Sequence, residues 1–182
     1  MKEIKISETE VKTAFSNSTE RFHVITTWVG LLLNLLWFIS DVFVLPEKWL
    51  AFFTFRASVS GLALLLVSFR KFLKIDIYAC MFVLVLGISI QNAYMWSVMD
   101  MAHFQKHAFA YMVLFIGVGM LVLWDIWYSI IILIATIVSN ILYYKFNSHL
   151  TVDEFVINGG LLVLTVNIFS VFLIRTRYRL TL

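Results

Sequence analysis

Two charged residues stand inside apolar stretches of the sequence, where a charge is costly. Asp41 lies near the end of the apolar stretch 23–45, and Arg56 lies about two helical turns into the stretch 50–69. Because the two stretches meet at a turn around Pro46, the two side chains are expected at similar depth in a membrane. Intramembrane charges pair with one another or mark functional sites. We therefore expect either an ion pair that locks the first helical hairpin or an arginine that anchors a ligand carbonyl or carboxylate.

Amide and aromatic side chains form a second group of candidates. An apolar cavity with a few convergent polar groups is the usual form of a small-molecule site. The alternative is that the amides form hydrogen bonds between helices, each contributing about 0.6–2 kcal/mol to helix association. The sequence leaves both interpretations open. The candidate pocket residues, besides Asp41 and Arg56, are Trp37, Gln91, Asn92, Tyr111, Asn140 and Asn158.

One spacing in the sequence is compatible with a metal site. The pattern Asp100-x-x-His103-x-x-x-His107 places three potential ligands on one helical face. Histidines four residues apart can chelate zinc or iron, and an aspartate one turn earlier can complete a triad. Neither an H-E-x-x-H motif nor a cysteine ligand accompanies these residues. A solvated or interfacial histidine pair is therefore the favoured interpretation, and a metal site is the weaker one.

Motifs for soluble enzyme chemistry are absent from the sequence. It contains no G-x-S-x-G, no Walker loop, no G-x-G-x-x-G and no C-x-x-C. We therefore predict no catalytic residue and no cofactor in this chain, and leave open whether it belongs to an enzyme.

The composition indicates that lipid surrounds the elements that carry these residues. The 182 residues are 62% hydrophobic and 14% charged, whereas a soluble domain is about 45–50% apolar and about 25% charged. The single cysteine excludes a disulfide scaffold. The excess of Lys and Arg over Asp and Glu, 14 against 11, is too small to predict nucleic-acid binding.

Six stretches are long enough to cross a bilayer. The hydrocarbon core is about 30 Å thick and needs roughly 20 apolar residues per helix. No period-2 alternation long enough for a transmembrane barrel is present. The sequence thus predicts an all-α, polytopic membrane protein with six transmembrane helices. The predicted spans are residues 23–45, 50–69, 75–97, 108–124, 126–144 and 155–174.

The positive charges predict the orientation of the spans. Ten of the fourteen Lys and Arg residues precede span one, separate spans two and three, or follow span six. By the positive-inside rule both termini are cytoplasmic, which puts most of the intramembrane polar groups in the outer leaflet of a bacterial inner membrane. The predicted organisation is a cytoplasmic segment 1–22, a six-helix domain 23–174, and the start of a cytoplasmic signalling helix at 175–182. That last prediction follows from the absence of a helix stop after span six.

The first predicted hairpin has a distinctive set of residues. The run W-F-I-S-D-V-F-V-L-P-E-K-W-L-A-F-F-T-F-R-A-S-V-S-G-L-A-L-L-L has an acid near the end of span one, a Pro-containing outer turn, Trp49, and Arg56 a few residues into span two. It resembles the first hairpin of six-helix input domains in bacterial sensor histidine kinases, the best known of which detect α-hydroxyketone autoinducers. The basic R-K-F-L-K loop, the short W-D turn and the N-I-F-S…R ending that starts at Asn167 are also similar.

The resemblance implies a membrane receptor domain, homodimeric through its exit helices. Such a domain binds a small amphipathic or lipid-like ligand and signals through helix six to a cytoplasmic histidine kinase. In those kinases a tryptophan and a serine on the fourth span help to hold the ligand, whereas residues 107–114 here read H-A-F-A-Y-M-V-L. The membrane domains of class III adenylyl cyclases have a similar layout and are an alternative. A small transporter or channel subunit is a further alternative, although the sequence has no inverted repeat or pair of broken helices.

Overall fold

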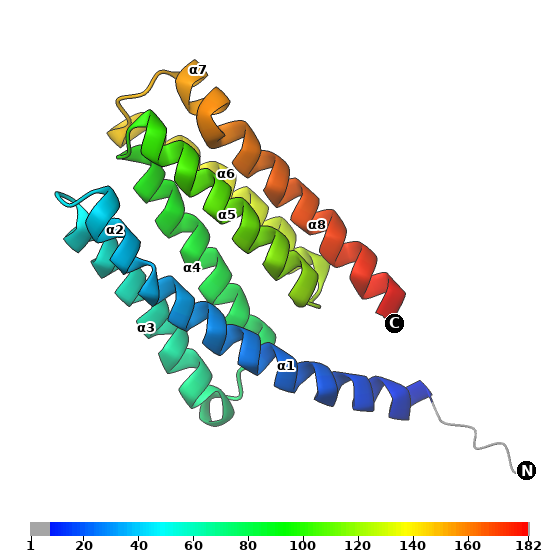
Figure 1. Ribbon diagram of the computed structural model, residues 1–182. Helices are drawn as coiled ribbons and strands as arrows, with labels where there is room; N and C mark the ends of the chain where they lie inside the picture. Colours follow the sequence, from blue (N-terminus) through cyan, green and yellow to red (C-terminus); the bar gives the residue numbers. More distant parts are fainter. Residues whose placement is uncertain (1–7, 182) are drawn as a thin grey trace, which may run out of the picture.

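The computed structural model describes residues 8–181, as helices joined by short turns (Figure 1). No strand is present in this range. Residues 1–7 of the predicted cytoplasmic segment, and Leu182 of the predicted signalling helix, lie outside it. The elements are α1 (Glu8–Leu36), α2 (Phe38–Val44), α3 (Trp49–Leu73), α4 (Ile77–Ser97), α5 (Met101–Leu121), α6 (Ile126–Asn147), α7 (Val152–Phe155), the π-helical turn η1 (Val156–Gly160) and α8 (Leu161–Thr181).

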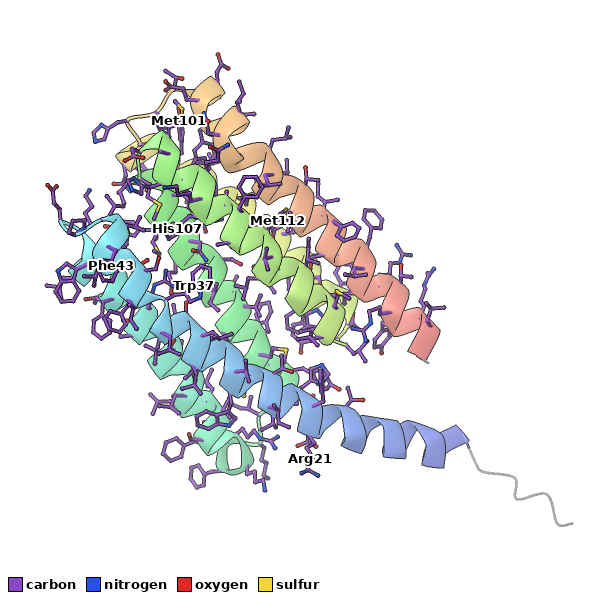
Figure 2. All side chains as sticks on the ribbon, viewed as in Figure 1. Arg21, Trp37, Phe43, Met101, His107 and Met112 are labelled. Carbon is purple, nitrogen blue, oxygen red and sulfur yellow. The ribbon has the colours of Figure 1, made fainter. Side chains whose placement is uncertain are left out.

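The prediction of an all-α chain with six apolar spans is confirmed for the described residues. Each span has the length and composition needed to cross a membrane. Apolar side chains cover the outside of the bundle, and Phe43 on α2 is among the most exposed (Figure 2). Such a surface suits a multi-pass membrane protein, because lipid there takes the place of water. The spans are Thr19–Val44, Trp49–Leu73, Ile77–Ser97, Met101–Leu121, Ile126–Asn147 and Val152–Leu180.

Capping groups, rather than the limits of the apolar stretches, decide where the helices begin. The fourth span begins at Met101 instead of residue 108, because Asp100 Oδ1 accepts the backbone N–H of His103 at 2.9 Å. The sixth begins after Thr151, which forms a capping box with Glu154. The first turns of these helices contain polar residues, so the apolar stretches begin later in the sequence than the helices do.

Helix α4 lies at the centre of the bundle. It packs against α1, α3 and α6, while α8 packs against α5 and α6. Figure 1 shows α1 and α3 on one side of α4, with α5 and α8 on the other. Both described ends of the chain lie at the same end of the bundle, as six spans require (Figure 1). The turns at residues 45–48 and 98–100 lie at the opposite end.

The π-helical turn η1 brings the start of the last span close to α5. Gly159 interrupts the helical backbone in this turn, with φ 165° and ψ −25°. A Cβ atom at Gly159 would lie 2.8 Å from Ala108 Cβ and 2.9 Å from Phe104 Cζ. Glycine thus permits a close approach that a larger residue would prevent, and α5 and α8 are held together along one side of the candidate site.

Candidate functional site

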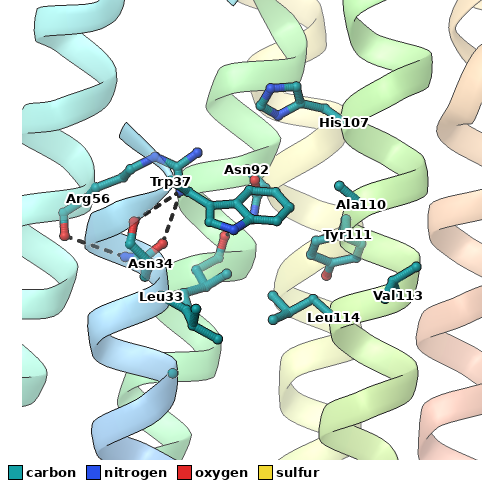
Figure 3. A pocket seen from close by; sticks show the side chains of 12 residues that line it. Leu33, Asn34, Trp37, Arg56, Asn92, His107, Ala110, Tyr111, Val113 and Leu114 are labelled. Atoms are coloured by element: carbon teal, nitrogen blue, oxygen red, sulfur yellow. Dashed lines mark hydrogen bonds between the residues drawn. The ribbon is translucent and has the colours of Figure 1, made fainter. Parts of the chain in front are cut away.

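A cavity of about 320 Å³ lies between α1, α3, α4 and α5 (Figure 3). Its volume falls at the lower end of the range for small-molecule sites, about 300–1,000 Å³. Most of its wall surface is apolar, and a few polar side chains converge on it from different helices. The lining residues are Gly30, Leu33, Asn34, Trp37, Arg56, Ile88, Asn92, His107, Ala110, Tyr111, Val113 and Leu114.

A buried ion pair forms the polar end of this cavity. Arg56 Nε donates to Asp41 Oδ2 at 2.6 Å, and Arg56 Nη2 donates to Asp41 Oδ1 at 3.1 Å. The arginine is 2% exposed and the aspartate 0%. The pairing expected from their similar depth is therefore present, in the two-pronged geometry that gives the strongest charge-assisted hydrogen bonds. It joins the end of the first span to the start of the second.

Asn34 extends the ion pair into a network that reaches α4. Arg56 Nη1 donates to the side-chain oxygen of Asn34 at 3.2 Å and to its backbone oxygen at 3.3 Å. Asn34 and Gln91 exchange amide hydrogen bonds, with Gln91 Nε2 donating at 3.0 Å and Asn34 Nδ2 donating at 3.3 Å. Asn34 Nδ2 also donates to Ser60 Oγ at 3.0 Å. The network links the four helices α1 to α4 and carries no net charge, because one guanidinium balances one carboxylate.

Several polar groups facing the cavity retain hydrogen-bonding capacity. Arg56 Nη2 carries two N–H groups, and only its bond to Asp41 is formed among residues 8–181. Asn92 uses its Nδ2 to donate to Ile88 O at 2.9 Å, and its Oδ1 has no partner in the described chain. His107 is 7% exposed, and its imidazole ring likewise has no hydrogen-bond partner among the described residues. Buried polar groups normally have partners, so these three groups indicate where a bound molecule would make its polar contacts.

Tyr111 connects the cavity wall to the last helix. It lies on α5, is buried, and packs edge-to-face against Trp96. Its hydroxyl accepts from Asn167 Nδ2 at 3.3 Å and lies 3.4 Å from Ser89 Oγ on α4. Asn167 belongs to α8 and also donates to Val163 O at 2.8 Å. This hydrogen bond therefore joins the cavity wall on α5 to the last helix, α8.

The structure brings some of the predicted pocket residues together and separates others. Trp37, Arg56, Asn92 and Tyr111 line the cavity. Asp41 and Gln91 lie behind its wall as partners of Arg56 and Asn34. The remaining two predictions fall elsewhere: Asn140 lines a separate cavity of about 140 Å³ between α6 and α8, and Asn158 in η1 donates to Glu154 O at 2.8 Å.

The proposed metal triad is not assembled. His103 Nδ1 lies 2.6 Å from Asp100 Oδ2 at the start of α5, whereas His107 faces the cavity (Figures 2 and 3). No group of three His, Cys, Asp or Glu side chains within the described part of the chain is placed to hold a metal ion. The hydrogen bonds from the backbone and ring of His103 instead lower the pKa of the Asp100 carboxyl, as expected for an N-cap.

Three polar residues of the cavity wall and its hydrogen-bond network are not among the predicted pocket residues: Asn34, Ser60 and His107. The first two had a signal in the sequence, since Asn34 stands seven residues before Asp41 and Ser60 four residues after Arg56. Both spacings place a polar residue on the same helical face as the charge. The spacing of His107 from His103 suggests the metal pattern instead, and only the packing of α5 decides that the His107 ring faces the cavity.

No protein-family model, curated protein or solved structure matches the chain. The cavity has hydrogen-bond donors and acceptors at one end and an apolar surface at the other. This arrangement suits the binding of a molecule with one polar and one apolar part.

Proposed function

We propose that this chain is the membrane receptor domain of a signalling protein. It binds a small amphipathic or lipid-like molecule in the cavity between α1 and α5, and relays binding through α8 to a cytoplasmic output domain, in the first place a histidine kinase. The observation that carries the proposal is the position of Tyr111, which lines the cavity and is hydrogen-bonded to Asn167 on the last helix. A class III adenylyl cyclase output is the alternative, since the same relay would serve it.

The charge balance of the site supports an uncharged polar group on the ligand. Asp41 already neutralises Arg56, so a ligand carboxylate would bring an unpaired buried charge, which is strongly unfavourable. A carbonyl or hydroxyl can accept from Arg56 Nη2 and meet Asn92 or His107 without that cost. If each non-hydrogen atom of a ligand takes about the 30 Å³ that a water molecule occupies in the liquid, the cavity of about 320 Å³ holds about ten such atoms.

The relay follows from the two ends of the bundle. The ligand would bind in the half of the bundle near the turns at 45–48 and 98–100, and α8 ends at the opposite end with Arg175, Arg177 and Arg179. By the positive-inside rule this basic end is cytoplasmic. If α8 has two positions and the ligand contacts Tyr111 better in one of them, binding shifts the equilibrium toward that position. In a homodimer, the paired exit helices would carry this shift to the output domain.

Binding by the purified chain in lipid nanodiscs tests the proposal. Uncharged ketones and alcohols of about ten carbons are expected to raise Tm, because a ligand at 100 times its Kd stabilises the folded state by about 2.7 kcal/mol. The double variant D41N/R56Q should lose this response. The matched control is E20Q/R70Q, which removes another ion pair between α1 and α3, at 2.8 Å and outside the cavity. An equal response in D41N/R56Q and the wild type would refute the assignment of the site.

A further inference from the structure

The side of the cavity between α1 and α5 is not closed by helix packing. Helix α1 packs on α3 and α4, whereas α5 packs on α8 and η1. Helix α4 lies between α1 and α5 and forms the back wall (Figure 1). Among the described residues, α1 and α5 therefore do not pack closely on each other along this seam, and the cavity lies between them.

Residues along this seam both line the cavity and face outward. Leu33 is 42% exposed, Trp37 39% and Val113 68%, although all three belong to the cavity wall. A side chain can meet both conditions only at an opening. All three are apolar and lie within spans long enough to cross a membrane. The opening thus faces hydrocarbon, and we use the name slot for this gap between Leu33 and Trp37 on one side and Val113 on the other.

The polar end of the cavity offers no comparable opening. Asp41 and Arg56 are buried against each other, and Gln91 is buried behind them. A water-borne molecule that entered past Arg56 would have to break the ion pair, and breaking a buried pair costs about 3–5 kcal/mol. Entry through the slot requires the displacement of apolar side chains alone.

A second, smaller cavity adjoins the main one along the seam. This smaller cavity of about 40 Å³ shares Gly30, Ile88 and Leu114 with the main one and extends to Thr27 and Val122. These residues follow α1, α4 and α5 away from the ion pair. An alkyl chain whose polar group meets Arg56 would therefore lie along the helices, in the same direction as the lipid chains outside.

We propose that the cavity fills laterally, from the lipid phase through the slot, so that the site receives molecules dissolved in the membrane. Trp37 is the side chain that must move. It stands between α1 and α2, where the helix is interrupted, and its indole lies at the mouth of the cavity (Figure 3). The identity of the ligand class rests on the proposed function, whereas the route is a property of the fold.

Photolabelling in nanodiscs tests the route. The probe is a primary alcohol of about ten carbons that carries a diazirine, sized to the cavity at about 30 Å³ per group. Dissolved in the lipid, it should label cavity residues such as Ala110 and Leu114. The variants V113W and L33W fill the slot and should each slow this labelling by about tenfold. The matched control I134W places the same side chain on the lipid-facing surface of α6, outside the cavity, and should label at the wild-type rate.

The outcomes separate the route from the proposed function. Unchanged labelling in both V113W and L33W, or equal labelling by a water-soluble trimethylammonium diazirine that does not enter lipid, overturns lateral entry and leaves the receptor proposal standing. Slot-dependent labelling supports the route. If that labelling is seen but D41N/R56Q responds to uncharged ligands as the wild type does, the route stands and the proposed function fails.

Discussion

Tyr111 and Asn167 are 56 residues apart in the sequence, and the tyrosine hydroxyl accepts a hydrogen bond from Asn167 Nδ2 at 3.3 Å. The contact joins α5 to α8 at the wall of the main cavity. It connects a residue of the cavity wall directly to the last helix.

Removing this hydroxyl should separate binding from signalling. Y111F keeps the ring in the cavity wall, so ligand affinity is expected to change less than about twofold, while the loss of one intramembrane hydrogen bond costs about 0.6 kcal/mol. The response of the full-length protein's output to ligand should fall sharply. Y144F is the matched control, since that tyrosine donates to Leu150 O at 2.7 Å away from the cavity. A normal response in Y111F would exclude the relay.

Replacing one partner of the buried ion pair should lower the free energy of unfolding far more than replacing both partners. R56Q leaves Asp41 buried without a counter-charge and is expected to cost about 3–5 kcal/mol of the free energy of unfolding. D41N/R56Q should recover a large part of this loss, because no buried charge remains. The free energies of unfolding of D41N, R56Q and D41N/R56Q give the coupling energy between the two residues. If the losses of the single variants simply add in the double variant, the two residues do not interact.

The close approach at Gly159 predicts opposite effects for two glycine substitutions. G159A places a methyl group 2.8 Å from Ala108 Cβ and should cost about 1–3 kcal/mol through overpacking between η1 and α5. G117A on α5 meets no atom within 4 Å and should be neutral or stabilise by up to about 1 kcal/mol. Thermal unfolding of the two variants checks this. Equal Tm values would contradict the packing described here.

His103 and His107 should differ in function despite their spacing. H107A removes a polar group from the cavity and is expected to weaken the binding of uncharged ligands by about tenfold, or about 1.4 kcal/mol. His103 lies at the start of α5 beside Asp100, so H103A should bind these ligands as the wild type does. Chelators should leave the Tm of the wild type unchanged. Stoichiometric zinc that is lost in both variants would instead restore the metal interpretation.

The spans and the ion pair could be predicted because they depend on composition and on distance along the chain. A helix that crosses about 30 Å of hydrocarbon needs about 20 apolar residues, so the stretches are visible in the sequence. Asp41 and Arg56 flank one short turn, which places them at similar depth for any packing of the hairpin. The start of α5 at Met101 was missed because capping by Asp100, not hydropathy, determines it.

Which amides converge on one cavity could not be predicted, because that depends on the rotation of each helix about its axis. Four residues at 100° each leave His107 about 40° from His103 around α5. That rotation is enough for His107 to face the cavity while His103 stays beside Asp100. Asn140 and Asn158 are expected from the sequence at the depth of the site, yet Asn140 lines a separate cavity and Asn158 donates to Glu154 O.

The sequence by itself determined the apolar character of the chain and the number of helices able to span a membrane, since both follow from local composition and the thickness of a bilayer. Only the tertiary structure decided that α1 and α5 leave a cavity between them, that Asn34 and Gln91 complete the ion-pair network, and that Tyr111 reaches Asn167. These contacts join residues far apart in the chain, and their formation depends on how helix faces pack against one another, which no single helix encodes alone.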